Sequence, residues 1–185
     1  GITPFLRLLP YVEASSFLVE VHFIIGLPSQ TPAQVLETIL FLMDKRLLLG
    51  PSIFYLAPGS PIFSHRVGEK WHPLLKSLRS SAMLPTNPLF PRRTTFTLMK
   101  LVRFVNYVKG LLDRQEISGK ISVCMAIPQG RHPVETDVLT TLLSEKRFVC
   151  PDTANGSMMD EPQDAGLVRL FFAVAKGRKI KGFRT

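Results

Sequence analysis

Residues 17–61 carry the pattern that most restricts how this chain can fold. The run FLVEVHFII over residues 17–25 is rich in Phe, Val and Ile, which is typical of a parallel strand covered on both faces. Gly26 and Pro28 predict the end of that strand, because glycine accepts turn conformations that other residues resist and proline cannot extend a ladder. A stripe of apolar residues at helical spacing follows from Val35 to Met43.

The start of the predicted helix is marked by three residues. Thr31 can cap the helix, Pro32 suits the first helical position, and Gln34 can reach back to complete a capping box. We expect Gly50-Pro51 to close this helix and residues 52–57 (SIFYLA) to form a second strand that stops at the sequence PGSP. Strand, helix and strand in this order predict two parallel strands joined by a crossover.

The rest of the chain predicts mainly helices. Residues 5–14 look like a loop or the end of a helix broken by proline. A strong helix is predicted over 94–114, where Lys100, Arg103 and Lys109 stand among the polar positions. The Asn-Gly turn signal predicts a hairpin within 147–160. Further features are a short helix or ordered loop at 69–82, a proline-rich connection at 83–93, and helices at 134–144 and 167–176.

Charge and cysteine content narrow the classes of function. The net charge of +9 permits contact with nucleic acid or an acidic partner, although the basic cluster at residues 176–184 is most simply a solvated tail. Cys124 and Cys150 lack Cys or His neighbours at metal-binding spacing, so we expect buried apolar cysteines in a cytoplasmic protein. No apolar run reaches the roughly 18 residues of a membrane span, so no membrane contact is expected.

The residues alone predict a place for a ligand but no catalytic group. In parallel α/β folds ligands bind beyond the carboxyl ends of the strands, here at residues 25–28 and 56–59. Backbone at such turns could bind a flat, polar-edged molecule such as a nucleoside, or the turns could serve only the fold. His22 shares a strand face with Glu20, and it either packs or points into a ligand cavity. The sequence contains no P-loop, G-x-G-x-x-G or H-E-x-x-H.

Two motifs, in the order in which they occur along the chain, nevertheless resemble those of a known family. "VHFIIGLPSQTPAQVLETILFL", followed by "SIFYLAPGSPIF", resembles the second half of the radical S-adenosylmethionine (SAM) enzymes. In that family a strand of the form D-x-I-x-G-[LF]-P-G-[EQ]-T runs into a helix, and the next strand ends in P-G-[ST]-P. The later stretches "RRTTFTLMKLVRFVNYVKGLLDR" and "LLSEKRFVCPD" are similar to the C-terminal extension of a subgroup whose members often carry a cobalamin-binding domain.

The resemblance implies a fold and a set of cofactors. The fold would be α/β, with the second half of a partial (β/α) TIM-like barrel in residues 1–68 and a mainly helical C-terminal extension with a small hairpin in 69–185. SAM and a [4Fe-4S] cluster would sit at the carboxyl ends of the strands, where electron transfer to SAM generates a radical that abstracts hydrogen from a substrate. Cobalamin is possible in this subgroup.

The resemblance also assigns roles to individual residues. Ile24 would pack near the adenine, while Gly26 and Leu27 would form the turn beside SAM. The next strand would supply mostly backbone contacts to the adenine. His22 stands where many members place an Asp that holds the ribose hydroxyls, so that contact would differ in geometry. The full set of implied cofactor-binding residues is His22, Ile24, Gly26, Leu27, Tyr55 and Leu56.

One departure from the family is large. The cysteine motif C-x-x-x-C-x-x-C, whose thiolates hold the cluster, is not in this sequence. The chain also starts at Gly1 rather than Met, so we expect a fragment whose missing N-terminal barrel half comes from the same gene or from a separate chain. This part would not be active alone. The alternatives are a stand-alone basic module that binds nucleic acid or an acidic protein, of which nucleic acid is the less expected partner, and a remnant without function.

Overall fold

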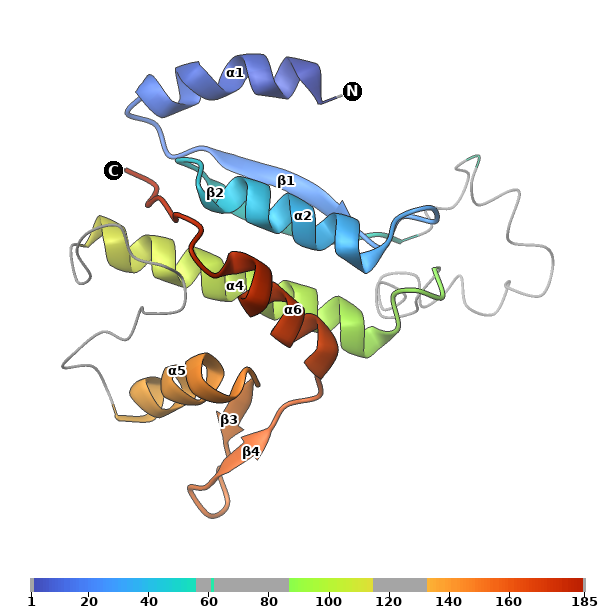
Figure 1. The fold of residues 1–185 in the computed structure, drawn as a ribbon, viewed down its shortest axis with the longest axis vertical. Helices are drawn as coiled ribbons and strands as arrows, with labels where there is room; N and C mark the ends of the chain where they lie inside the picture. The colour runs from blue at the N-terminus through green and yellow to red at the C-terminus, as the bar shows by residue number, and fades with distance from the viewer. Residues whose placement is uncertain (1, 56–60, 62–86, 115–132, 185) are drawn as a thin grey trace.

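The computed structural model describes residues 2–55, 61, 87–114 and 133–184 (Figure 1). This part of the chain is mixed α/β, with five helices and four short strands. The elements in chain order are α1 (Thr3–Ala14), β1 (Glu20–Ile25), α2 (Pro32–Met43), β2 (Leu48–Ile53), α4 (Arg92–Asp113), α5 (Pro133–Glu145), β3 (Val149–Pro151), β4 (Met158–Asp160) and α6 (Ala165–Ala175). The three helices predicted after residue 90 are confirmed, as is the hairpin, which is formed by the antiparallel strands β3 and β4.

The predicted parallel strand pair is also confirmed. β1 and β2 run side by side in the same direction, with Glu20 opposite Leu48 and Ile25 opposite Ile53. Their carboxyl ends are therefore level at one edge of the sheet. No closed barrel is formed by the described residues, in which this pair is a two-stranded sheet.

The start of α2 follows the sequence prediction closely. The Thr31 hydroxyl accepts a hydrogen bond from the backbone N–H of Gln34 at 3.3 Å, and the Gln34 side chain accepts one from the backbone N–H of Thr31 at 2.9 Å. Both halves of the capping box are present, and Pro32 occupies the first turn. These bonds satisfy N–H groups that have no partner inside the helix, which fixes where the helix begins.

The predicted helix end at Gly50-Pro51 is wrong, as are the predicted bounds of the second strand. Helix α2 ends at Met43, and Gly50 and Pro51 lie inside β2, opposite His22 and Phe23 of β1. A Cβ atom on Gly50 would lie 2.4 Å from Glu20 Oε1 and 3.0 Å from His22 Nδ1. Glycine is therefore used here to make room for two side chains of the neighbouring strand, and not to stop a helix.

The sheet is covered by helices on one face. Asn106 of α4 joins that helix to β2, because its side chain accepts a hydrogen bond from the N–H of Leu49 at 3.1 Å and donates one to the Leu49 carbonyl at 2.8 Å. Buried side chains of β1, α2, α4 and α6 form one hydrophobic core. Elements from both predicted domains share this core, while the boundary after residue 68 stays a prediction.

The opposite face of the sheet is exposed. Glu20, His22 and Ile24 alternate along β1 with residues that point into the core, and the Ile24 side chain is 44% exposed. The prediction that this strand is covered on both faces is therefore wrong. Phe17 and Leu18, which the prediction placed in the strand, precede β1 and are exposed.

Lys109 is fully buried, although the sequence pattern placed it among the polar positions of its helix. Its Nζ donates hydrogen bonds to the carbonyl oxygens of Lys45 at 2.6 Å and Lys181 at 2.8 Å. Loss of hydration lowers the pKa of Lys109 to about 7, although the charges of Asp44 and Asp113 act in the opposite direction.

The backbone at the end of the C-terminal segment is docked on the fold, whereas the basic side chains of this segment are exposed, as predicted for a solvated cluster. Asp113 accepts hydrogen bonds from the N–H groups of Phe183 and Arg184, each at 2.9 Å. The Arg46 guanidinium donates to the Phe183 carbonyl at 3.0 Å. Lys181 forms an ion pair with Glu13 at 2.6 Å. Residues 181–184 thus connect the ends of α1, α2 and α4.

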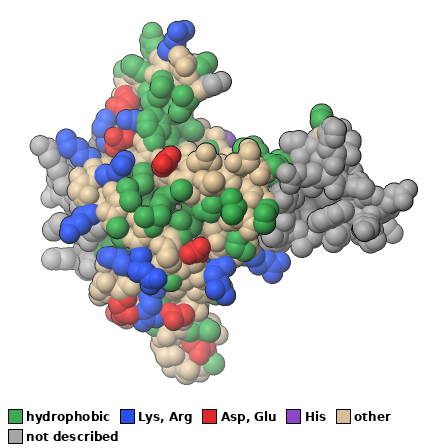
Figure 2. Space-filling model, turned by 45° about the vertical axis from the view of Figure 1, so that its right-hand side comes forward, with side chains coloured by type: hydrophobic (Ala, Val, Ile, Leu, Met, Phe, Trp, Pro, Cys, Tyr) green, Lys and Arg blue, Asp and Glu red, His purple; other side chains and the backbone are tan. Residues whose placement is uncertain are grey.

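Helix α1 lies at one end of the molecule and keeps much of its apolar surface exposed (Figures 1 and 2). Pro10 lies inside this helix, where the sequence indicated a loop or a helix end. The ring of Phe5 packs edge-on against Phe41 of α2, at 6.4 Å between centroids, whereas Leu8 and Tyr11 are exposed. Among the described helices, none has the length and apolar character needed to cross a membrane.

Candidate functional site

The candidate site lies where β1 ends. The chain leaves Ile25 through Gly26, whose φ of +93° is a backbone conformation that residues with a Cβ rarely adopt. Space is not the reason for glycine here, because the nearest atom to an added Cβ would be Cγ of Phe90 at 3.9 Å, an ordinary contact. The turn predicted at this glycine is therefore present, and it depends on backbone conformation.

The side chain of Gln30 holds this turn together. Its Oε1 accepts hydrogen bonds from the N–H groups of Gly26 at 2.7 Å and Leu27 at 3.3 Å, and its Nε2 donates to the carbonyl of Ile24 at 3.0 Å. One amide side chain therefore satisfies three backbone groups. The two N–H donors at the strand end are already engaged, so they are not free to bind a ligand while Gln30 stays in place.

Asn87 supports the same turn from a distant part of the sequence. This residue is only 2% exposed, and its Nδ2 donates to the carbonyls of Leu27 at 2.7 Å and Gln30 at 2.8 Å. Its Oδ1 accepts from the N–H of Leu89 at 2.9 Å. Sequence reasoning did not identify Asn87. The only local signal was an Asn-Pro pair, which favours a turn but says nothing of its partners.

Beside the turn, the exposed face of β1 carries two ionisable side chains. His22 Nε2 lies 3.7 Å from Glu20 Oε1, and both side chains are largely exposed. They lie over Gly50 of the neighbouring strand, where an added Cβ atom would come within 3.0 Å of each of them. Next to them the exposed Ile24 side chain offers an apolar surface. The arrangement can stack a flat apolar group on Ile24 and offer hydrogen bonds from His22.

The structure brings together four of the six predicted site residues. His22, Ile24, Gly26 and Leu27 follow one another along β1 and its turn. Tyr55 lies two residues beyond β2 instead of within it, and its side chain is 55% exposed. Because Ile25 and Ile53 are level, Tyr55 leaves the sheet at the same edge as Gly26. Leu56 lies outside the described residues, as do the other three histidines of the sequence, His65, His72 and His132.

The residues present do not fit an iron–sulfur cluster. The sequence has two cysteines, fewer than the three of the family motif. Cys150 is a free cysteine on β3 in the hairpin, and Cys124 lies outside the described residues. Across the described ranges, no three His, Cys, Asp or Glu side chains form a group that could hold a metal ion.

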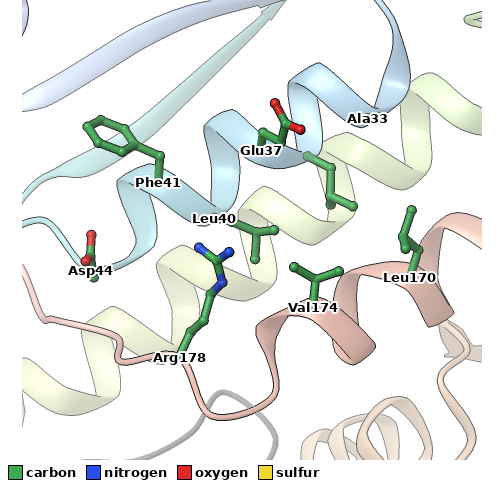
Figure 3. Close-up of a pocket in the computed structure, with 9 residues that line it drawn as sticks. Ala33, Glu37, Leu40, Phe41, Asp44, Leu170, Val174 and Arg178 are labelled. Atoms are coloured by element: carbon green, nitrogen blue, oxygen red, sulfur yellow. The ribbon is translucent and has the colours of Figure 1, made fainter.

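A separate groove lies among the helices. Apolar residues of α2 and α6 line it, and its cavity volume is about 430 Å³. Figure 3 shows Leu40 of α2 facing Val174 of α6, with Arg178 extending from the segment after α6 toward α2. None of the predicted site residues lines this groove, so the strand-end site is distinct from it.

Comparison with known proteins found no relative of this chain. Neither the family models, nor the curated proteins, nor the solved structures gave a match to this chain.

Proposed function

We propose that this chain is the C-terminal part of a radical SAM enzyme and that the end of β1 contributes to its SAM-binding wall. The observation that carries the proposal is the parallel β1–α2–β2 unit, with helices on one face and an exposed opposite face. In a (β/α) barrel the helices lie outside and the other face of each strand points to the interior. The exposed residues of β1 would then face the barrel interior.

Individual residues would have separate tasks in binding SAM. The apolar surface of Ile24 would pack against the adenine, and the imidazole of His22 could donate to or accept from the ribose hydroxyls. Tyr55 would approach from the end of the neighbouring strand. The N–H groups of Gly26 and Leu27 would help indirectly, because their bonds to Gln30 fix the turn. This differs from direct backbone contact, which would require Gln30 to move.

The iron–sulfur cluster would have to be held by residues outside this chain. A second segment, encoded by the same gene or by a separate one, would supply the cluster ligands and the remaining strands. The chain described here would supply one side of the nucleoside site and the helical extension. A cobalamin-binding domain is suggested by the resemblance alone.

Binding of SAM to the chain provides the test. We would titrate the ¹⁵N-labelled protein with SAM at millimolar concentration and follow backbone amide shifts by NMR. The expected shifts lie at His22, Ile24, Gly26 and Tyr55. Ile24→Asp should remove them because it places a charge where the adenine would pack, and His22→Ala should weaken them.

A matched control separates this result from unspecific binding. Val174→Asp places the same charge on an exposed apolar position of α6, in a groove that none of the predicted site residues lines, and should leave the shifts unchanged. The proposal fails if SAM shifts no residue at the end of β1, or if Ile24→Asp and Val174→Asp behave alike.

A further inference from the structure

A second cavity lies between α4, α5 and the hairpin, away from the strand-end site. Its volume is about 480 Å³, within the range of pockets that bind small molecules. The floor is apolar and consists of buried side chains: Phe104, Leu139, Leu142, Phe148 and Val149. Such a floor favours a ligand with a hydrocarbon body, since burying it removes apolar surface from water.

Charged and polar side chains surround this floor. Lys100 forms an ion pair with Glu161, and its Nζ also donates to the carbonyl of Pro162 at 3.2 Å. The hydroxyl of Tyr107 donates to the carboxylate of Glu135. Both acidic residues of the rim therefore already accept a hydrogen bond within the protein.

Arg103 is the exception on this rim. It is exposed one helical turn before Tyr107 on α4, and its guanidinium has no hydrogen-bond or ion-pair partner among the described residues. Among the described residues of the rim, Arg103 is thus the cation without a partner, and it lies beside an apolar floor. A guanidinium binds a carboxylate through two parallel N–H donors, which makes a carboxylate the complementary head group.

We infer that this pocket binds a monocarboxylate with an apolar chain, such as a medium-chain fatty acid. The carboxylate pairs with Arg103, and the chain lies on Phe104, Leu142 and Phe148. An amine head group is disfavoured because it would place a second positive charge beside Arg103. The inference is independent of SAM binding, since none of the strand-end residues lines this cavity.

Calorimetric titration with decanoate, below its micelle concentration, tests this inference. Each methylene removed from the chain should weaken binding about fourfold, as burial of about 0.8 kcal/mol per methylene implies. Decylamine has the same chain and the opposite charge, so it should bind more weakly than decanoate. Equal binding of the two would contradict the role of Arg103.

Two variants locate the site. Arg103→Gln should weaken decanoate about fivefold, as expected for an exposed charge pair, whereas Arg169→Gln, at an exposed arginine of α6, should have no effect. Val138→Trp should fill the mouth of the pocket and reduce binding of every chain length. The inference is wrong if Val138→Trp binds decanoate like the unaltered protein, or if both arginine variants lose affinity equally.

Discussion

The side-chain nitrogen of Lys109 lies 2.8 Å from the carbonyl oxygen of Lys181, a residue 72 positions later in the chain. Together with its bond to the Lys45 carbonyl, this contact makes a buried lysine the link between α4, the end of α2 and the C-terminal segment. Because a neutral amine keeps two N–H donors, both bonds can persist when the charge is lost.

The free energy of unfolding should therefore rise with pH between pH 7 and pH 9, where few other groups titrate. The pKa of Lys109 is about 7 in the folded protein and 10.5 in the unfolded chain, so between these values the unfolded chain binds more protons. The free energy of unfolding should increase from pH 7 to pH 9 by at most about 2 kcal/mol. Urea unfolding at several pH values measures this slope.

Lys109→Met provides the control for that slope. The variant removes the titrating group along with two hydrogen bonds, so we expect it to be less stable than the unaltered protein at pH 9 by about 1–2 kcal/mol. At pH 6 the difference should shrink or reverse, because a buried charge is removed. An identical pH dependence in both proteins would show that Lys109 does not titrate in this range.

Asn87→Ala should be strongly destabilising for a residue in a loop. The change leaves the partly buried carbonyls of Leu27 and Gln30, and the N–H of Leu89, without their partner. We expect a loss of about 2–4 kcal/mol in the free energy of unfolding. Asn155→Ala, in the exposed hairpin turn, should cost less than about 1 kcal/mol. Similar losses in the two variants would argue against the role of Asn87.

Gly26→Ala and Gly50→Ala should differ, although both place a methyl group at the sheet. At Gly26 the positive φ makes alanine strained, which costs about 1–2 kcal/mol. At Gly50 the methyl group meets the end of the Glu20 side chain, which can rotate away. Gly50→Ala should thus cost less than Gly26→Ala and instead shift the NMR signals of His22. The reverse order of stabilities would contradict this reading of the two glycines.

Arg46→Lys should loosen the C-terminal segment. The Arg46 side chain donates to the carbonyls of Glu13, Ser15 and Phe183, and a lysine cannot reproduce this planar set of donors. Hydrogen exchange at Phe183 and Arg184 should accelerate about tenfold, which corresponds to the loss of one charged hydrogen bond. Lys179→Arg, at an exposed position, serves as the control. Unchanged exchange in Arg46→Lys would contradict the role of Arg46 in holding the C-terminal segment.

Local signals in the sequence predicted much of the fold. The capping box of Thr31 and Gln34, the turn at Gly26 and the long apolar stripe of α4 each involve neighbours within a few residues. For this reason the elements could be recognised without their surroundings. The same motif placed His22, Ile24, Gly26 and Leu27 in one candidate site, because they are close together on one strand and its turn.

The roles that the sequence did not predict depend on contacts between residues far apart in the chain. Gly50 was predicted to end a helix. Its actual role is to leave space for side chains of β1, which lie about 30 residues earlier in the sequence and are not visible in the local pattern. Lys109 resembled a surface lysine because its carbonyl partners come from residues 45 and 181. Asn87 gave little signal, since it bonds to backbone groups about 60 residues earlier. Neither helical spacing nor residue type records such contacts.

The docking of residues 181–184 also has a consequence for the order of assembly during synthesis. Lys181 pairs with Glu13, 168 positions away, and Phe183 accepts from Arg46, 137 positions away. Contacts of such long range form late, because closing a large loop costs entropy before the contacts are made. The ends of α1 and α2 therefore complete their hydrogen bonds only after the segment that reaches back to them has emerged from the ribosome.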